Sequence, residues 1–246
     1  MNNMRFEVFA ETDVGLRREI NQDSILVDHE LGLFVVADGM GGHRGGEVAS
    51  LLAVQTMQQH IRKVLKTGKF VAKTLLHDAY REASARIHHK STVESPDLMG
   101  MGTTMVGFFA QKGRAYISNV GDSRAYLFRV DSLWQLTDDH SLINEQIKAG
   151  VIREEDAEQV VGRNVITRSV GYEREVQTDI LERELIAGDQ FLLCSDGLSS
   201  LITNQKIQEI CNTYKPDKIV PQCIKEAKNA GGDDNVSVIF IRYLGA

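Results

Sequence analysis

Acidic residues stand next to apolar, strand-like segments at three places in the chain. Asp38 directly follows the apolar run at 33–37, Asp196 follows the run at 191–195, and Asp234 precedes the run at 236–241. Short runs rich in β-branched and aromatic residues are typical of buried strands, and a buried charge is costly unless it is paired or bound to a metal. If these strand ends meet, their carboxylates form the oxygen-rich site that Mg²⁺ or Mn²⁺ prefers.

The Asp-Gly pairs at 38–39 and 196–197 have a second explanation, because this dipeptide is common in turns. A turn explains any one of the three acidic sites about as well as a metal ligand does. Their recurrence at three strand ends favours the metal site. Asp122, within Gly-Asp-Ser-Arg at 121–124, adds a fourth acidic residue at a strand junction.

A phosphate-binding side chain lies near the first acidic segment. Arg18 precedes a polar stretch at 21–24, and the planar donor fork of arginine suits phosphate. Two divalent ions that share Asp38 would lower the pKa of a bridging water and generate hydroxide at neutral pH. These residues therefore predict direct attack of a metal-bound water on a phosphate ester.

Two other phosphate chemistries lack their motifs. A cysteine nucleophile requires an arginine six residues later, but the positions six residues after Cys194, Cys211 and Cys223 hold serine, aspartate and asparagine. The glycines at 41–42 are not followed by the Lys-Ser/Thr of a P-loop. The three cysteines show no CxxC spacing, which is typical of a reducing compartment.

The composition is that of an ordinary globular protein. Of the 246 residues, 42% are hydrophobic and 25% are charged, and the formal net charge is −6. This acidic balance argues against nucleic acid or an anionic membrane as the main partner. Since the sequence has neither a membrane-length apolar stretch nor an apolar N-terminal signal, we expect a cytoplasmic protein.

The patterns around these residues predict one α+β domain over 1–246, because no linker rich in Pro, Gly or Ser interrupts the chain. Helical periodicity covers 46–66, 71–89, 204–212 and 216–229, and a helix capped by Ser141 or Asp139 is expected over 142–149. Strand candidates are 5–10, 25–27, 33–38, 101–110, 114–120, 125–129, 133–137, 165–170, 176–181, 191–195 and 236–241. Their hairpin spacing favours antiparallel sheets with the helices packed outside.

The motifs, taken in order, resemble those of the metal-dependent protein serine/threonine phosphatases, the PPM or type 2C family, and most of all its compact bacterial members. They are Asn-Gln-Asp-Ser at 21–24, Asp-Gly-Met-Gly-Gly-His at 38–43, Gly-Thr-Thr at 102–104, Gly-Asp-Ser-Arg at 121–124, Asp-Gly at 196–197 and Gly-Asp-Asp-Asn at 232–235. Each motif alone is weak, but six in order are specific. The resemblance implies a four-layer α/β/β/α sandwich, with two antiparallel sheets flanked by helix pairs and a flap at about 143–165.

The resemblance also implies a centre of two Mn²⁺ or Mg²⁺ ions. Asp38 would bridge the ions, with the carbonyl of Gly39 as a further ligand, and Asp196 and Asp234 would complete the first ion. Asp122, together with Asp196, matches the position of a third and weaker ion. The catalytic set is then Arg18, Asp38, Asp196 and Asp234, in which Arg18 binds phosphate.

Residues next to this set have supporting roles in the resemblance. Asp23 would contact metal-bound water, Asn235 would support the ligands, and Gln22 is assigned an outer role because many members carry glutamate there. Met40 stands where eukaryotic members have a proposed general-acid histidine. His43 is a candidate substitute, and a water on the third ion is the other candidate for protonating the leaving group.

Three functions remain open at this point. The first is a phosphoprotein phosphatase that opposes a bacterial Ser/Thr kinase, expected as a monomer with phosphorylated proteins as substrates. The second is a catalytically silent binding or regulatory module of the same fold. The third is a small-molecule phosphoesterase with the same metal centre. Intact Asp38, Asp122, Asp196 and Asp234 argue against the second.

Overall fold

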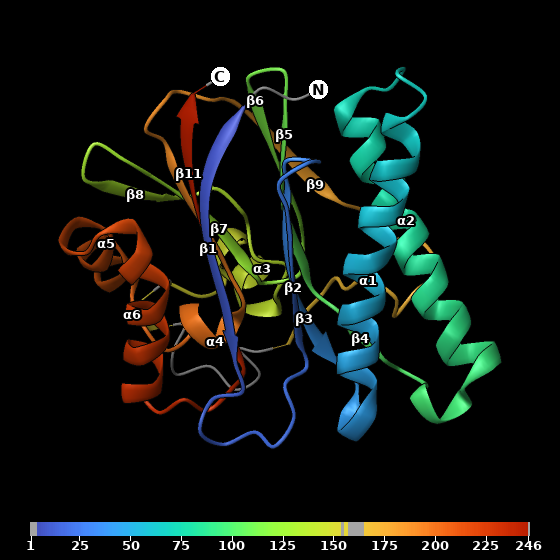
Figure 1. Cartoon of the computed structure of the whole chain (residues 1–246). Helices are drawn as coiled ribbons and strands as arrows, with labels where there is room; N and C mark the ends of the chain where they lie inside the picture. The colour runs from blue at the N-terminus through green and yellow to red at the C-terminus, as the bar shows by residue number, and fades with distance from the viewer. Residues whose placement is uncertain (1–3, 154, 157–164, 246) are drawn as a thin grey trace.

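The computed structural model describes residues 4–153, 155–156 and 165–245, and for residues 42–44 it describes the backbone alone. Figure 1 shows two sheets packed face to face between two helix layers, with both chain ends at the same end of the sandwich. The predicted α+β fold with a four-layer α/β/β/α arrangement is confirmed.

Both sheets are antiparallel. The first contains, in spatial order, β1 (Arg5–Asp13), β11 (Val236–Gly245), β10 (Gln190–Cys194), β7 (Arg124–Arg129) and β8 (Ser132–Gln135). The second contains β2 (Asp23–Asp28), β3 (Leu33–Met40), β5 (Met105–Gln111), β6 (Arg114–Val120) and β9 (Asp179–Glu184), and the two-residue β4 (Gly102–Thr103) pairs with the end of β3.

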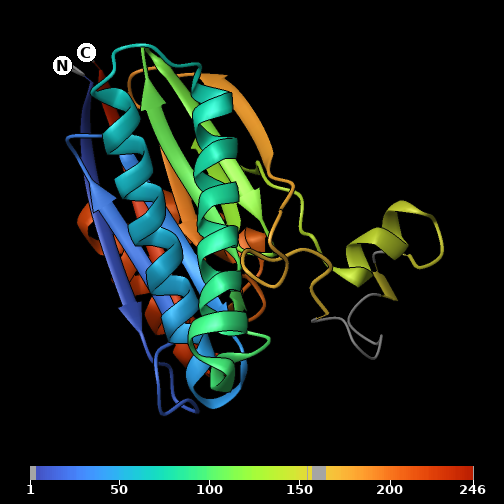
Figure 2. The same ribbon diagram turned by 90° about the vertical axis from the view of Figure 1, so that its right-hand side faces the viewer.

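A helix pair covers the outer face of each sheet (Figure 1). The helices are α1 (Gly42–Leu65) and α2 (Ala72–His89) on the second sheet, and α5 (Asn204–Thr213) and α6 (Pro216–Asn229) on the first. Short helical segments are α3 (Leu142–Lys148), α4 (Asp196–Ser199), the π-helical η1 (Lys90–Glu94) and the 3₁₀ segment η2 (Pro96–Leu98). Figure 2 shows α3 beside the four layers rather than within them.

Three apolar clusters hold the layers together. The middle one packs the two sheets against each other and centres on aromatic rings, with Phe108 and Phe191 from opposite sheets 4.9 Å apart between centroids. The outer two lie under the helix pairs. Every residue at 33–37 is buried, which explains why this stretch of β3 reads as a continuous apolar run.

Some predicted boundaries were wrong. The segment 165–170 is not a strand, because Ile166 and Val170 form isolated bridges to two different segments, at Ser141 and Thr103. The strand expected at 176–181 begins later, at Asp179, where it can pair with β6. Helix α1 begins at Gly42 rather than residue 46, so its first turn includes glycines that the sequence pattern had left in a loop.

The flap predicted at 143–165 falls partly on residue 154 and residues 157–164, which lie outside the described ranges, and it stays a prediction. The cap predicted at Ser141 is confirmed, since its side chain accepts a hydrogen bond from the backbone N–H of Asn144. None of the helices in the described ranges combines the length and the apolar character that crossing a membrane requires.

The fully buried Tyr80 joins α2 to the sheet beneath it. Its hydroxyl donates to the carbonyl of Met105 (2.9 Å) and lies 3.1 Å from the hydroxyl of Ser118. We expect Tyr80→Phe to lower the free energy of unfolding by about 1–2 kcal/mol, because two buried polar groups lose a partner. Urea unfolding measures the change, with the partly exposed Tyr214→Phe as a control expected to stay within about 0.5 kcal/mol of the parent. Equal stabilities for the two variants would contradict this role of Tyr80.

Candidate metal centre

The four acidic residues singled out in the sequence line one cleft of about 690 Å³. Asp38 lies in β3 of the second sheet, Asp196 follows β10 of the first, Asp234 precedes β11 of the first, and Asp122 lies in the bend between β6 and β7, where the chain passes from one sheet to the other. Arg18, Gln22, Gly39, Met40 and Asn235 also line this cleft.

Asp38 is fixed by its backbone. Its N–H donates to the hydroxyl of Thr104 (3.1 Å), and its carbonyl accepts from the N–H of Thr104 and the hydroxyl of Thr103, both at 2.8 Å. The Thr104 hydroxyl is also 2.6 Å from that of Ser123, the neighbour of Asp122. The Gly-Thr-Thr motif therefore connects the backbone of one carboxylate to the loop that carries another.

Gly39 lets the first turn of α1 approach the end of β3. A Cβ at Gly39 would lie 2.0 Å from the carbonyl oxygen of Gly46, and a Cβ at Gly46 would lie 2.6 Å from the carbonyl oxygen of Gly39. Neither position can hold a side chain without moving the helix. The glycines of this motif serve close packing at the cleft.

Asp196 opens the short helix α4 directly after β10. The hydroxyl of its neighbour Ser195 accepts from the N–H of Ser237 (3.0 Å) and donates to Oδ2 of Asp23 (2.8 Å). This buried hydroxyl joins β10, β11 and β2, which come from both sheets. Asp23 itself lies behind the cleft rather than in its lining.

Arg18 and Asp234 face each other across the cleft mouth. Nη2 of Arg18 donates to Oδ2 of Asp234 at 2.8 Å, while half of the Arg18 side chain stays exposed. Asn235 secures the loop that carries Arg18, because its side chain accepts from the N–H of Gln22 and donates to the carbonyls of Val14 and Ile20. The amide of Gln22 reaches Glu47 of α1 at 3.3 Å.

Asp139 and His140 hold the residues on either side of Asp122. The carboxylate of Asp139 pairs with the guanidinium of Arg124 through both oxygens, the shortest contact being 2.6 Å. Nδ1 of His140 accepts from the N–H of Gly121 (3.0 Å), and the His140 N–H donates to the Gly121 carbonyl (3.0 Å). The Asp122 bend is thus held on both sides by two consecutive residues.

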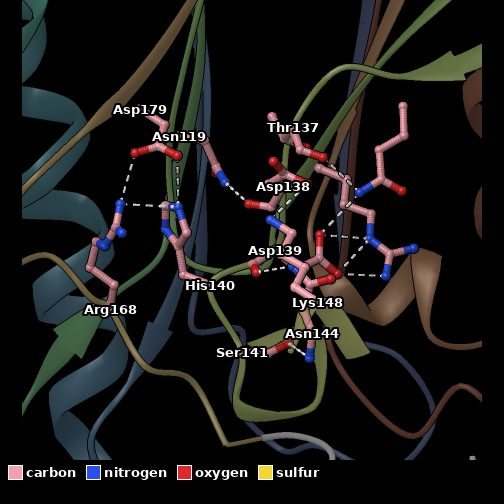
Figure 3. Close-up of polar contacts among 12 residues, drawn as sticks. Asn119, Thr137, Asp138, Asp139, His140, Ser141, Asn144, Lys148, Arg168 and Asp179 are labelled. Carbon is pink, nitrogen blue, oxygen red and sulfur yellow. Dashed lines mark hydrogen bonds and ion pairs between the residues drawn. The ribbon is translucent and has the colours of Figure 1, made fainter. Parts of the chain in front are cut away.

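The second ring nitrogen of His140, Nε2, lies beside an ion pair, as Figure 3 shows. Nε2 lies 3.3 Å from Asp179 and 3.1 Å from Arg168, and these two residues pair at 2.8 Å. Because the backbone N–H of Gly121 is a fixed donor, Nδ1 carries no proton and Nε2–H faces Asp179. Burial, followed by the charge of Arg168, lowers the pKa of His140, so the ring is held neutral.

The cleft gathers more negative charge than the protein around it balances. Oδ1 of Asp23, Asp122 and Asp196 is buried without a hydrogen-bond partner. Burial, reinforced by the neighbouring carboxylates, raises the pKa of Asp38 well above its usual range and raises those of Asp23 and Asp122 to about 7. Buried carboxylate oxygens without a partner fit a hard divalent cation.

The carboxylates line the cleft without forming a closed ligand shell. In the part of the chain that the structure describes, no three His, Cys, Asp or Glu side chains are grouped so as to hold an ion without adjustment. Two of the predicted outer residues, Gln22 and Asn235, line the cleft. His43 lies in the first turn of α1, and its side chain is outside the described part.

Sequence reasoning missed the hydroxyl and imidazole contacts that fix the ligands. Thr104, Ser123 and Ser195 stand inside or beside the acidic motifs, which is the signal that could have identified them. The sequence predicts only a candidate helix-capping role for Asp139 and assigns no role to His140. Their contact with the Asp122 bend spans 15 to 19 residues, and no local pattern reveals it.

The model of the family described as Protein phosphatase 2C matches residues 17–222. The chain belongs to the protein phosphatase 2C family. This confirms the predicted family and enzyme class, and the match extends from the Arg18 segment into α6.

Relatives in this phosphatase family match over nearly the full length. The chain is 35% identical to the serine/threonine phosphatase stp of Listeria innocua, covering 94% of this chain and 93% of that protein. It is 37% identical to the protein phosphatase PhpP of Streptococcus pneumoniae, covering 96% of each.

Solved structures of the family share the fold. The Mycobacterium tuberculosis serine/threonine phosphatase PstP/Ppp superposes with a TM-score of 0.89 at 34% identity, covering 98% of this chain and 99% of that one. A PstP catalytic domain solved in complex with two manganese ions gives a TM-score of 0.87 at 32% identity, covering 98% of this chain and all of that one.

Two substitutions test whether His140 fixes the Asp122 bend through Nδ1. In Asn the side-chain oxygen takes the place of Nδ1, so His140→Asn keeps an acceptor for the Gly121 N–H. His140→Gln loses that acceptor and leaves the N–H buried and unpaired, at a cost of about 1–3 kcal/mol. Urea unfolding in EDTA should rank the parent first, Asn next and Gln last. Equal losses for Asn and Gln would contradict the role of Nδ1.

The neutral state of His140 also predicts a pH dependence. The pKa of His140 is lowered on folding, whereas the unfolded ring titrates near 6.5. The contribution of neutral His140 to the free energy of unfolding is therefore fully present above about pH 6.5, and it declines as the pH falls toward the pKa of the folded state. We expect the stability advantage of the parent over His140→Asn to shrink between pH 7.5 and 5.5, measured by urea unfolding at each pH. A pH-independent difference would show that His140 does not titrate in this way.

Proposed function

We propose that this chain hydrolyses phosphoserine and phosphothreonine in proteins with the help of divalent metal ions. The observation that carries the proposal is the convergence of four carboxylates, two of them with unpartnered buried oxygens, beside an exposed arginine. The family membership and the similarity to enzymes named serine/threonine phosphatase support it. The two manganese ions of the PstP structure support the metal requirement.

The residues that would hold the ions are those lining the cleft. Asp38 would hold both of two Mn²⁺ or Mg²⁺ ions, with the carbonyl of Gly39 as a further ligand, while Asp196 and Asp234 would complete the first ion and Asp122 would hold a third with Asp196. When bound, such ions lower the pKa of a water to give a nucleophile at neutral pH and offset charge on the phosphate.

The protein's own groups would orient the phosphoester. Arg18 is half exposed and donates to Asp234 through Nη2, so the rest of its donor fork can turn to the phosphate oxygens. Asn235 and Gln22 would hold the Arg18 loop and the backbone around the ligands. Asp23, behind the cleft, would contact metal-bound water. His43 stays the candidate for protonating the leaving alkoxide.

Two other functions compete with this one. A catalytically silent binding module would have no need for four carboxylates gathered in one cleft. A small-molecule phosphoesterase would use the same centre, and a nucleotide substrate compared with a phosphopeptide distinguishes the two. We further propose that the protein is a single domain, a cytoplasmic monomer, and opposes a bacterial Ser/Thr kinase rather than acting on nucleic acid, in keeping with the net charge of −6.

The central test is phosphate release from a phosphothreonine peptide in Mn²⁺. We expect EDTA to abolish release, and Asp38→Ala and Asp196→Ala each to lower kcat/KM by on the order of 100-fold or more, since each variant removes a ligand oxygen from the centre. Malachite-green detection of phosphate gives the rates.

A matched control removes one carboxylate, as the two cleft variants do, but at a position outside the cleft. Asp78→Ala removes a partly exposed carboxylate of α2 that pairs with Arg81 of the same helix, and it should retain the parental rate. Release that persists in EDTA, or an equal loss in Asp78→Ala, would contradict the metal centre. Hydrolysis of a nucleotide but not of the peptide would favour the small-molecule phosphoesterase.

A further inference from the structure

A second cavity, of about 480 Å³, opens beside the carboxylate cleft. Met40 and Ile166 line both, so the two spaces are neighbours at this edge. An extended chain advances about 3.3 Å per residue. A polypeptide that placed a phosphorylated side chain in the cleft would therefore carry roughly two or three neighbouring residues across the second cavity.

One wall of this cavity is held in a fixed position relative to Asp38. Val170 exchanges two backbone hydrogen bonds with Thr103 (2.8 and 2.9 Å), and the Thr103 hydroxyl donates to the Asp38 carbonyl. From the other side, the buried hydroxyl of Ser84 on α2 accepts from the N–H of Gly171 and donates to the carbonyl of Glu173. The wall is thus tied to both the helix layer and the strand that carries Asp38.

The lining of the cavity is acidic. Glu173 and Glu175 are exposed in it, and Arg168 is the one basic residue among the described residues of the lining. The Arg168 charge is already paired with Asp179 at 2.8 Å. Tyr172, 67% exposed, adds an aromatic ring at the same wall. Two carboxylates and an aromatic ring together suit an arginine or lysine side chain.

We propose that this cavity, lined by Met40, Ile166, Tyr172, Glu173 and Glu175, binds the substrate segment next to the phosphorylated residue and selects segments with a basic side chain there. The inference rests on the proposed function, because it assumes that the cleft binds the phosphorylated side chain. It adds the substrate class: phosphoproteins with arginine or lysine within about three residues of the phosphorylated position.

The test uses phosphothreonine peptides that differ at one position at a time. Each position from three before to three after the phosphothreonine carries Arg, Gln or Glu, and kcat/KM is measured in Mn²⁺ at low salt. We expect Arg to exceed Gln by roughly 3- to 20-fold at one or two adjacent positions, since each exposed ion pair contributes about 1.5- to 5-fold. Glu at the same positions should fall below Gln, and the preference should shrink as salt is added.

A double variant assigns the preference to the cavity. Glu173→Gln with Glu175→Gln should bring the Arg-to-Gln ratio close to 1 while hydrolysis of p-nitrophenyl phosphate is unchanged. The matched control is Glu7→Gln with Glu209→Gln, which removes the same charge from the β1 edge and from α5 and should retain the full ratio.

The outcomes separate this inference from the proposed function. If all peptides are hydrolysed at similar rates, the selectivity is overturned and the phosphatase activity stands. A preference that survives in Glu173→Gln with Glu175→Gln also overturns it. If none of the peptides is hydrolysed by the metal-loaded parent, the proposed function fails with it.

Discussion

The free-energy cost of burying several carboxylates close together is the constraint on which the rest of this structure depends. Asp38, Asp122 and Asp196 lie around one cleft, where lost hydration, and then repulsion by neighbouring carboxylates, opposes their ionisation. A protein accepts such an arrangement when it serves a ligand of opposite charge, because the same carboxylates placed on the surface would cost almost nothing. Their positions at the ends of β3, β6 and β10 make the whole sandwich the support of the cleft.

The two-sheet architecture explains how these residues meet. Asp38 lies in a strand of the second sheet, Asp196 follows a strand of the first, and the chain passes from the second sheet to the first at Asp122. The aromatic core between the sheets fixes their relative position. Hydrogen bonds through Thr104 and Ser195 then connect Asp38 to the loop of Asp122, and the neighbour of Asp196 to Asp23 in the other sheet.

The acidic strand ends, the hairpins and the helix pairs could all be predicted, because period and turn chemistry are local properties of the sequence. The boundary errors came from long-range packing. Gly42 and Gly45 are poor helix formers, yet they lie in the first turn of α1, where a Cβ at Gly45 would lie 2.9 Å from the Cβ of the distant Met101. The contacts of His140 could not be predicted for the same reason, since Gly121 and Asp179 are distant in sequence and lie beside it only in the folded chain.

The most direct test of this account compares Asp38→Asn with the parent in unfolding experiments, with EDTA and with Mn²⁺. In EDTA the neutral amide should make the variant more stable, since it removes a charge that folding buries among other carboxylates. In Mn²⁺ the parent should gain about 2.7 kcal/mol at one hundred times its Kd, and the variant should gain far less. A variant that is less stable in EDTA and keeps the full Mn²⁺ gain would contradict the account.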